Sequence, residues 1–217
     1  MARTIIIAGG ALKNYGWYKA FLREDDRIIC ADHGLDHAVK LGVIPDLIVG
    51  DFDSAAEENL SCFQAKGVPC RSYKCDKDLT DTQIALDFAL QEKPDEIVFL
   101  AVLGDRLDHS WSNVLLLTKA AEKKVQARIV TSRSEVFLAV PGKNCISGRK
   151  GDLISLLPIT PAVKEITTKG LAYALDRQEL VITNPYAVSN VLLAEQAMVS
   201  IGEGLLLIIR NYGKGKR

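Results

Sequence analysis

The sequence lacks an excess of either charge. Lysine and arginine together number 27, as do aspartate and glutamate, so the formal net charge is zero. A balanced surface has no general attraction for nucleic acids or anionic membranes, which bind proteins through clustered cations. We therefore expect neither as a partner. The short basic tail at residues 214–217 is expected to be a solvated chain end.

Cysteine is scarce, and long apolar runs are missing. The five cysteines are odd in number and have no CxxC spacing, so they predict neither a disulfide framework nor a zinc knuckle. Cys30 lies in an apolar run and is expected to be a small buried hydrophobe. No segment has the length needed to cross a bilayer, and the first apolar run is too short for a signal peptide. These absences predict a cytoplasmic protein.

The common short motifs for nucleotides and zinc are also missing. Gly9 and Gly10 follow an apolar run, but their spacing to Gly16 fits neither GxGxxG nor a Walker loop. The pair predicts either backbone amides that approach a phosphate or a plain turn after a strand. His33 and His37 lie four apart, but without an HExxH motif zinc is not favoured.

The chain has 217 residues, of which 48% are apolar and 25% charged, the profile of an ordinary globular protein. Over residues 1–130, short apolar runs alternate with segments of helical period, and Gly42 is a natural helix C-cap. This alternation predicts an α/β domain with a mostly parallel sheet flanked by helices. In such sheets ligands bind beyond the carboxyl ends of the strands. The expected strands are Thr4–Ala8, Arg27–Ala31, Leu47–Val49, Ile97–Val102 and Val125–Val130.

Over residues 131–217 the pattern changes to short alternating runs. Apolar residues alternate in Leu171–Leu175, Leu180–Ile182, Val199–Ile201 and Leu205–Ile209. Between the last two runs, Gly202-Glu203-Gly204 predicts a hairpin. This half is therefore expected to be antiparallel, a β-sandwich or a partial barrel, of which we favour the β-sandwich.

Acidic residues gather in three groups beside apolar stretches. These groups are Gly50–Ser54, Asp76–Asp81 and Gly104–His109. Carboxylates clustered against a core are costly to desolvate unless a positive partner meets them. A hard divalent ion such as Mg²⁺ takes oxygen ligands and commonly keeps a phosphate ligand as well. The pattern predicts phosphoryl-transfer chemistry.

Each of the first two groups also has a structural interpretation. Asp51 and Asp53 are two apart after a strand, so both carboxylates can reach one ion, or Asp53 can cap the next helix. Thr80 is the expected N-cap of a helix with Asp81 in its first turn. A carboxylate there favours the helix dipole whether or not it binds metal. This helix is expected to bury Ile84, Ala85, Phe88 and Ala89.

The third group precedes another predicted helix. Asp108 is either its N-cap or a functional carboxylate. Arg106 is the best candidate to bind phosphate, because its planar donors match phosphate oxygens, with an ion pair to Asp105 or Asp108 as the alternative. His109 is more typical of a solvated histidine than of a catalyst. The helix is expected to place Trp111, Val114, Leu115 and Thr118 on one face.

Taken in order, these motifs resemble the thiamine pyrophosphokinase family. Cys30–Gly34 resembles its ADGG strand end, and Ile44–Ser54 resembles its PDxxxGDFDS signature. Asp76–Thr82 is similar to its DKDxTD motif, and Gly104–His109 to its GGRLDH motif. Asp36 and Asp105 depart from the family pattern, where an amide and a glycine are usual. The likeness covers nearly the whole chain, and Ser189-Asn190 and Gly204–Ile209 match its C-terminal SN and GLLLVI segments.

The resemblance implies an enzyme, with ATP and thiamine as its substrates. A pyrophosphoryl group passes from ATP to the thiamine hydroxyl, and AMP leaves. It also implies a nucleotide-binding catalytic domain, a thiamine-binding β-sandwich and a homodimer with active sites at the interface. The implied magnesium ligands are Asp51, Asp53 and Asp81. Other implied contacts with nucleotide, phosphate or thiamine are Asp32, Gly34, Lys77, Gly104, Arg106, Asp108, Ser189 and Asn190. No general base is evident from the sequence, and the candidates are Asp81 and Asp108.

Two other functions remain open from the residues alone. The strand followed by Asp51-Phe52-Asp53 superficially matches phosphohydrolases that form an aspartyl-phosphate. A non-catalytic protein that binds thiamine or a nucleotide is the second alternative. From Asn184-Pro185-Tyr186 and Ser189-Asn190 we expect either contacts with a polar heterocycle or ordinary Asx and Ser turns.

Overall fold

A computed structural model describes residues 2–50, 57–72 and 79–213 of the chain. The chain divides into two compact units, Met1–Ser132 and Arg133–Arg217. None of the helices in the described ranges is long and apolar enough to cross a membrane.

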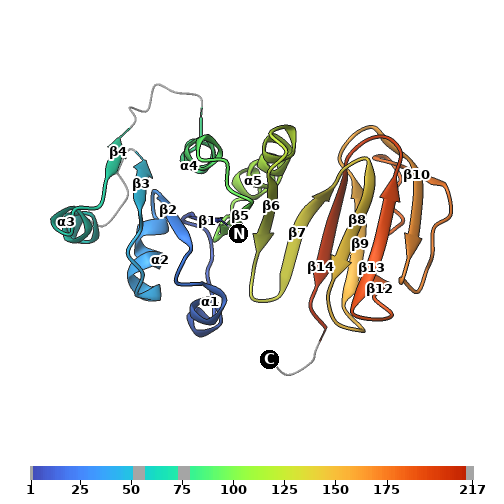
Figure 1. Ribbon diagram of the computed structural model, residues 1–217, viewed down its shortest axis with the longest axis horizontal. Coiled ribbons are helices and arrows are strands. Elements are labelled where there is room, and N and C mark those ends of the chain that lie inside the picture. The colour runs from blue at the N-terminus through green and yellow to red at the C-terminus, as the bar shows by residue number, and fades with distance from the viewer. Residues whose placement is uncertain (1, 51–56, 73–78, 214–217) are drawn as a thin grey trace. The chain divides into compact units, whose positions relative to one another are not determined.

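The first unit is built around a parallel sheet (Figure 1). Its strands lie in the order β6-β5-β1-β2-β3-β4, and each neighbouring pair is parallel. In chain order its elements are β1 (Arg3–Ile7), α1 (Tyr15–Phe21), β2 (Arg27–Ala31), α2 (Gly34–Leu41), β3 (Leu47–Gly50), α3 (Glu57–Ala65), β4 (Cys70–Ser72), α4 (Asp81–Gln91), β5 (Glu96–Leu100), α5 (Leu107–Glu122) and β6 (Gln126–Val130).

Helices cover both faces of this sheet, as the apolar strands require. Ile5 and Ile7 of β1 pack in a core with Tyr18 of α1 and Leu35 of α2. Ile6 points to the opposite face and is also fully buried. Helices α4 and α5 lie on that opposite face, with α4 against β1, β2 and β3 (Figure 1). The predicted parallel sheet flanked by helices is confirmed.

The buried strands of the sheet could be predicted from the sequence, but the edge strand β4 could not. The expected strand Arg27–Ala31 has the observed bounds, and Gly42 ends α2 with a left-handed φ of 72°. Sequence analysis missed β4, because this three-residue edge strand is partly exposed and has no apolar run. Cys30 is fully buried, as expected, and burial raises the pKa of its thiol.

Helix α4 begins as predicted but buries a different set of residues. The Thr80 hydroxyl accepts a hydrogen bond from the Gln83 amide at 3.2 Å, which confirms Thr80 as the N-cap. Phe88 was expected in the core and is only half-buried, whereas Leu86 is fully buried. Because Phe88 and Leu86 are both strongly apolar, the sequence alone does not indicate which of them is buried.

The structure of α5 excludes one of the two interpretations of Asp108, and the apolar face predicted for this helix is wrong. The helix begins at Leu107 with Arg106 at the N-cap position, so Asp108 lies inside the first turn and does not cap it. Of the expected apolar face only Val114 is buried, since the side of α5 that packs on the sheet is made by Asn113, Leu116, Leu117 and Ala120. Trp111 and Leu115 are 51% and 40% exposed.

The second unit is an antiparallel β-sandwich, as predicted. One sheet has the order β12-β9-β14-β7 and the other β11-β10-β13-β8. Apolar side chains from both sheets form one core, including Ile154 and Ile208 from the first and Val163 and Val199 from the second. The strands are β7 (Ser134–Ala139), β8 (Gly142–Ser147), β9 (Leu153–Pro158), β10 (Ala162–Lys169), β11 (Gln178–Val181), β12 (Asn190–Val191), β13 (Gln196–Ile201) and β14 (Leu206–Asn211).

Two local predictions in this unit are wrong. Gly202-Glu203-Gly204 does not close a hairpin, because β13 pairs with β8 and β10 whereas β14 pairs with β7 and β9. The segment carries the chain from one sheet to the other. Leu171–Leu175 is not a strand, although Leu171 forms an isolated bridge with Leu192.

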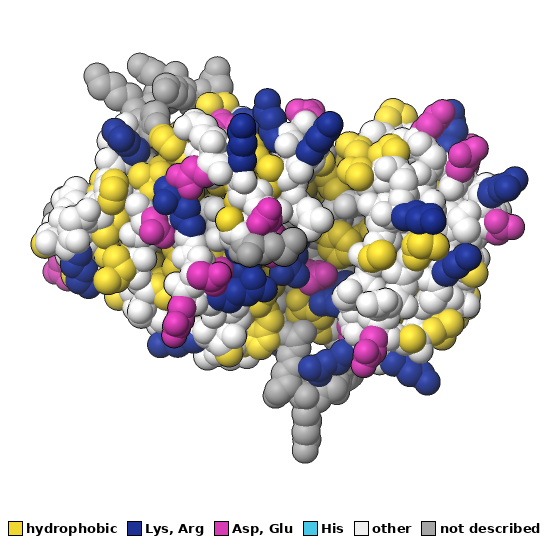
Figure 2. Space-filling view, viewed as in Figure 1, with side chains coloured by type: hydrophobic (Ala, Val, Ile, Leu, Met, Phe, Trp, Pro, Cys, Tyr) yellow, Lys and Arg dark blue, Asp and Glu magenta, His cyan; other side chains and the backbone are white. Residues whose placement is uncertain are grey.

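The surface matches the balanced composition. Figure 2 shows basic and acidic side chains interspersed over the described surface of each unit on the face in view. This is the distribution expected when neither sign of charge is in excess.

Candidate active site

A cleft of about 700 Å³ opens at the carboxyl ends of β1, β2 and β5. The strand order reverses between β1 and β5, with β2 following on one side and β6 on the other. In open parallel sheets this reversal is where ligands bind. The cleft is lined by Ala8, Gly9, Gly10, Ala11, Ala31, Asp32, His33, Thr80, Asp81, Thr82, Ala101, Val102, Gly104, Asp105, Arg106, His109, Ser110 and Asn113.

Two strands end in unfavourable backbone conformations at this cleft. Asp32 follows β2 with φ of 45°, and Ala101 follows β5 with φ of 55°. Residues with a Cβ rarely adopt this left-handed region, and the strain is on the order of 1 kcal/mol each. The surrounding fold holds both against that preference, a pattern common where a site must be shaped precisely.

Gly10 is held by packing and not by a free amide. Its N–H donates to the carbonyl of Ala101 at 2.6 Å. A Cβ on Gly10 would lie 2.4 Å from that carbonyl oxygen and 2.7 Å from the carbonyl oxygen of Leu103. The Gly10 amide is therefore not available to approach a phosphate. Gly10 instead fits the other interpretation, a plain turn after a strand.

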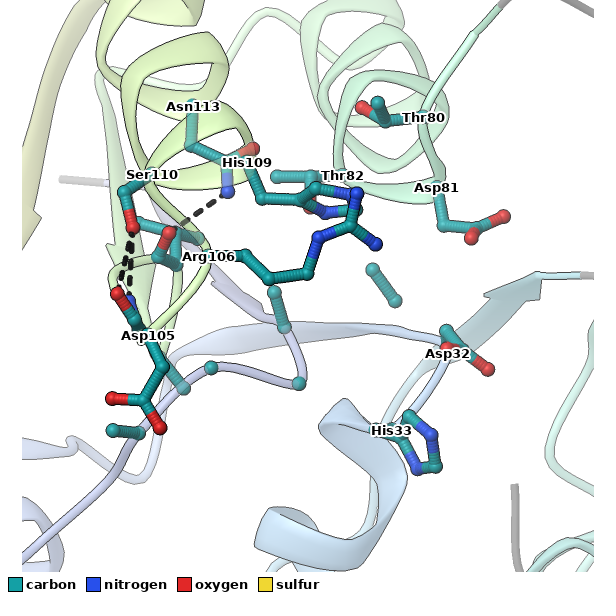
Figure 3. A pocket seen from close by; sticks show the side chains of 18 residues that line it. Asp32, His33, Thr80, Asp81, Thr82, Asp105, Arg106, His109, Ser110 and Asn113 are labelled. Carbon is teal, nitrogen blue, oxygen red and sulfur yellow. Dashed lines mark hydrogen bonds between the residues drawn. The ribbon is translucent and has the colours of Figure 1, made fainter. Parts of the chain in front are cut away.

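Two residues that sequence analysis missed hold the loop between β5 and α5. The Ser110 hydroxyl accepts from the Gly104 amide at 3.0 Å and lies 3.2 Å from the Gly104 carbonyl. The buried Asn113 amide donates to the carbonyl of Val102 at 2.8 Å. Figure 3 shows both interactions as dashed lines at the left of the view. The available signal was weak, because Ser110 and Asn113 are only two of several polar residues on this helix.

The start of α4 brings a carboxylate to the cleft. Asp81 is the first residue of α4, and Thr80 already satisfies the helix end. Asp81 is therefore not needed as a cap, although the helix dipole stabilises its charge. Figure 3 shows Asp81 and Asp32 on the same side of the cleft, with the Arg106 side chain extending toward them from the start of α5.

Arg106 forms an ion pair with Asp108. The guanidinium donates to both carboxylate oxygens, from Nε at 3.3 Å and from Nη2 at 2.7 Å. Both side chains are about two-thirds exposed, at 69% and 66%. The hydrogen bonds from Arg106 hold the pKa of Asp108 at about 2. Asp108 is therefore a weak proton acceptor near neutral pH and stands outside the cleft lining.

Helix α2 starts very close to the end of β1. A Cβ on Gly34 would lie 1.9 Å from the carbonyl oxygen of Ile7. Two residues on, Asp36 accepts a hydrogen bond from the Asn59 amide of α3 at 2.6 Å and lies 3.5 Å from His33. Asp36, which departs from the family pattern, thus links two helices.

In the second unit, the Asn190 amide is occupied by backbone groups. Its Oδ1 accepts from the Tyr173 N–H at 2.9 Å, and its Nδ2 donates to the Tyr173 carbonyl at 2.7 Å. Asn190 is buried, whereas Tyr173 is 71% exposed. The neighbouring Ser189 has φ of 60° and donates its N–H to the Ser155 hydroxyl at 3.1 Å. Asn190 fixes the Tyr173 segment beside Ser189.

Three of the predicted site residues, Asp51, Asp53 and Lys77, lie outside the described residues. Of the remainder, the structure brings Asp32, Asp81, Gly104 and Arg106 together around the cleft. Within residues 2–50, 57–72 and 79–213 there is no cluster of three or more potential metal ligands. The predicted magnesium site therefore stays a prediction.

The family model described as "Thiamin pyrophosphokinase, catalytic domain" matches residues 18–130, more than half of the chain. The chain belongs to the thiamin pyrophosphokinase family. A second family model, "Thiamin pyrophosphokinase, vitamin B1 binding domain", matches residues 143–206. The first match falls within the first structural unit and the second within the β-sandwich.

Similar proteins support membership of the thiamin pyrophosphokinase family over nearly the full length. Thiamine pyrophosphokinase of Bacillus subtilis (strain 168) is 28% identical over 207 residues, covering 95% of this chain and 97% of that protein. Its crystal structure has a TM-score of 0.88 over 97% of this chain and 99% of that chain. The thiamin pyrophosphokinase structure from Geobacillus thermodenitrificans has a TM-score of 0.86 at 28% identity, covering 99% of both chains. The family resemblance seen in the motifs is confirmed, and neither alternative function is favoured.

Proposed function

We propose that this chain transfers a pyrophosphoryl group from ATP to the hydroxyl group of thiamine, giving thiamine diphosphate and AMP. The thiamine oxygen forms a bond to the β-phosphorus, the bond from that phosphorus to the α-phosphate oxygen breaks, and the hydroxyl proton is released. The observation that carries the proposal is the cleft at the strand reversal, which Asp81 and Arg106 both line. A carboxylate suits magnesium, and a guanidinium suits phosphate oxygens.

The proposed magnesium ligands are Asp51, Asp53 and Asp81. All are carboxylates, and hard divalent cations prefer oxygen ligands. Asp81 lines the cleft, and Asp51 directly follows Gly50, the last residue of β3. When bound, the ion would neutralise charge on the phosphates. The chemical type of these side chains therefore fits the proposed ion.

The remaining first-unit residues are proposed to bind the nucleotide and the reacting phosphates. Asp32, Gly104 and Arg106 line the cleft. Gly34 lies behind it and lets α2 approach β1. Lys77 is proposed as a phosphate contact from its motif alone.

Asp108 is proposed to act mainly through Arg106. Its low pKa makes it a poor general base near neutral pH. Its two hydrogen bonds instead hold the guanidinium in one orientation at the edge of the cleft. Phosphate oxygens can replace the carboxylate, because both match the planar donors of arginine.

The second unit is proposed to hold the thiamine ring. The backbone of Tyr173 is bonded to Asn190, the residue that follows Ser189, and the Tyr173 side chain is exposed. An aromatic face and a hydroxyl suit a flat, polar heterocycle. The amide of Asn190 contributes by holding Tyr173, because its donor and acceptor are both used on that backbone.

Replacing Asn190 with alanine is therefore expected to raise the KM for thiamine about tenfold. The substitution leaves the Tyr173 N–H and carbonyl without their side-chain partner, a loss of about 1–3 kcal/mol. Steady-state kinetics should show the KM for ATP within about twofold of wild type. Asn144→Ala is the matched control, since Asn144 makes similar bonds to Val140 in another turn of the same unit. A KM for thiamine that rises equally in both variants would contradict the role of Asn190.

A homodimer with active sites at the interface is proposed from the exposed face of α5. Leu107, Trp111 and Leu115 are four residues apart and 80%, 51% and 40% exposed. This apolar stripe begins next to Arg106, at the edge of the cleft. Contiguous exposed apolar side chains are typical of protein interfaces.

If the stripe is the interface, Trp111→Lys should convert the dimer to a monomer and lower activity. A charge at the centre of an apolar contact would be desolvated without a partner. Light scattering after gel filtration measures the mass. Val39→Lys is the control, because Val39 is also an exposed apolar residue on a helix of the first unit. A Trp111→Lys protein that keeps a dimer mass would exclude this surface.

The reaction is tested by measuring AMP and thiamine diphosphate with ATP and Mg²⁺, with and without thiamine. We expect the two products in equal amounts, and only when thiamine is present. Phosphate release from ATP alone would indicate a phosphohydrolase, and thiamine or nucleotide binding without turnover would indicate a binding protein. Either result would overturn the proposed function.

The cytoplasm is the proposed location. The odd number of cysteines without CxxC spacing fits a reducing compartment, where thiols are kept free. No nucleic-acid or membrane partner is proposed, because the charge is balanced.

A further inference from the structure

His37 connects two helices to the wall of the cleft. It lies on α2 and is half-buried, and both of its ring nitrogens have partners. Nε2 lies 2.8 Å from the carbonyl oxygen of Gly10, and Nδ1 lies 2.7 Å from the hydroxyl of Tyr15 on α1. A carbonyl oxygen only accepts hydrogen bonds, so Nε2 carries the proton. Nδ1 then accepts the hydroxyl proton of Tyr15, and the neutral ring is satisfied at both ends.

Both ring nitrogens of His37 are already used within the protein. His33 lines the cleft, whereas His37 does not. His37 can therefore affect the cleft only indirectly, through its hydrogen bond to the backbone of Gly10.

Gly10 connects His37 to the cleft, because it lines the cleft and is hydrogen-bonded to the histidine. Its N–H is bonded to Ala101 at the end of β5, and its carbonyl is bonded to His37. The next residue, Ala11, donates its N–H to the carbonyl of Leu103 at 3.0 Å. Two backbone hydrogen bonds thus hold the segment Gly9–Ala11 against the residues that follow β5. On the side of α2, the hydrogen bond from the His37 ring holds the same segment.

We propose that His37 is a positioning residue for nucleotide binding, which fixes the Gly9–Ala11 segment of the cleft wall through the Gly10 carbonyl, with Tyr15 setting its tautomer. The inference rests on the proposed function, because it assumes that ATP occupies this cleft. It adds a residue that touches neither substrate nor metal.

The charges around His37 favour the neutral ring. Burial lowers its pKa below the usual 6.5, and Lys40 and His33 act in the same direction. The hydrogen bond to Gly10 and the charge of Asp36 oppose them. From α1 the facing titratable group is Tyr15. Since the folded protein binds fewer protons here than the unfolded chain, this contribution to stability is present above pH 6.5 and is lost as pH falls through that value to the lowered pKa.

The test compares His37→Leu and His37→Gln in steady-state assays with ATP and thiamine varied separately. Leucine removes the bond to Gly10 and should raise the KM for ATP about tenfold, the effect of one buried hydrogen bond. The KM for thiamine should stay within about twofold. Glutamine can place an N–H near the position of Nε2, so it should recover most of the affinity for ATP. Equal KM values for ATP in wild type and His37→Leu would overturn the proposal, as would a glutamine variant as impaired as the leucine one.

A second measurement does not depend on activity. The chain has three histidines, so ¹⁵N NMR of the rings can assign the tautomer of each. We expect His37 to carry its proton on Nε2, and Tyr15→Phe to raise the fraction of rings with the proton on Nδ1, because the hydroxyl that donates to Nδ1 is lost. A proton on Nδ1 in wild type, or an unchanged tautomer ratio in Tyr15→Phe, would contradict the proposal.

Tyr18→Phe is the matched control on α1. The Tyr18 hydroxyl accepts a hydrogen bond from the Ser132 amide at 3.1 Å, and neither residue lines the cleft. This variant should lose stability without a change in the KM for ATP or in the His37 ring signals. If wild type makes no AMP, the proposed function fails. If wild type is active and only the His37 effects are missing, the positioning role alone fails.

Discussion

Replacing Asp81 with asparagine is expected to lower kcat by roughly 10²- to 10³-fold, the usual effect of losing one preorganised electrostatic group. Asparagine keeps the shape of the side chain and removes the negative charge proposed to hold magnesium. Stability should fall by less than about 1 kcal/mol, because Thr80 caps α4 and Asp81 adds only its dipole interaction. AMP release at increasing Mg²⁺ measures the effect, and excess Mg²⁺ should recover part of it.

Asp87→Asn is the control on the same helix. Asp87 pairs with Lys119 at 2.5 Å, away from the cleft lining. A partly exposed pair of this kind contributes about 0–1 kcal/mol, so activity should be unchanged. If Asp81→Asn kept wild-type turnover, the magnesium role would have to be withdrawn.

Replacing Gly34 with alanine should destabilise the first unit by about 3 kcal/mol, at the upper end of overpacking effects. The new Cβ would lie 1.9 Å from the carbonyl oxygen of Ile7 and 2.6 Å from its carbonyl carbon. Both are main-chain atoms of a central strand, so α2 must move away from β1. The KM for ATP should rise as well, because β1 and β2 end at the cleft. Thermal or denaturant unfolding measures the loss.

Gly16→Ala gives the opposite expectation. Gly16 is exposed near the start of α1, and a Cβ there would meet only the Asn14 side chain, at 3.9 Å. Alanine is a better helix former than glycine by up to about 1 kcal/mol. Stability should therefore stay the same or rise. Equal losses in the two variants would show that the close approach at Gly34 has no special effect.

The parallel sheet could be predicted because its strands are apolar on both faces. Ile5, Ile6 and Ile7 are all fully buried, and a run of this kind signals a central strand without reference to its neighbours. Thr80 and Gly42 were equally clear, since helix ends depend on local chemistry. The order of the strands was not contained in these local signals.

Helix α5 shows where periodicity failed. It has apolar residues on two sides, one with Leu116 and Leu117 and one with Trp111 and Leu115. Helical spacing identifies which residues share an apolar face of the helix, but it does not show which of two such faces packs against the sheet. The buried Asn113 made the packed side look less apolar than it is, because its amide is satisfied by the Val102 carbonyl in the loop before α5, a contact that helical spacing does not report.

Only part of the candidate site could be predicted, because motifs report local chemistry and not contacts between segments. The motifs placed Asp81 and Arg106 at helix starts, and the structure brings both to one cleft. The motif around Asn190 predicted a ligand contact, whereas the amide is used on Tyr173. Nothing in the local sequence reports that pairing. The role of His37 likewise depends on a carbonyl group from another part of the chain, that of Gly10.

The pairing of β1 with β5 has a consequence for how the first unit folds. Arg3 pairs with Glu96, and Ile7 with Leu100, so the two strands that flank the strand reversal are separated in the sequence by β2, β3, β4 and the helices between them. Joining them closes a long loop, which is entropically unfavourable and slow compared with local contacts. We infer that the cleft is assembled late, after β1, β2 and β3 have formed neighbouring pairs. A ligand that requires the finished cleft would then slow unfolding more than it accelerates refolding.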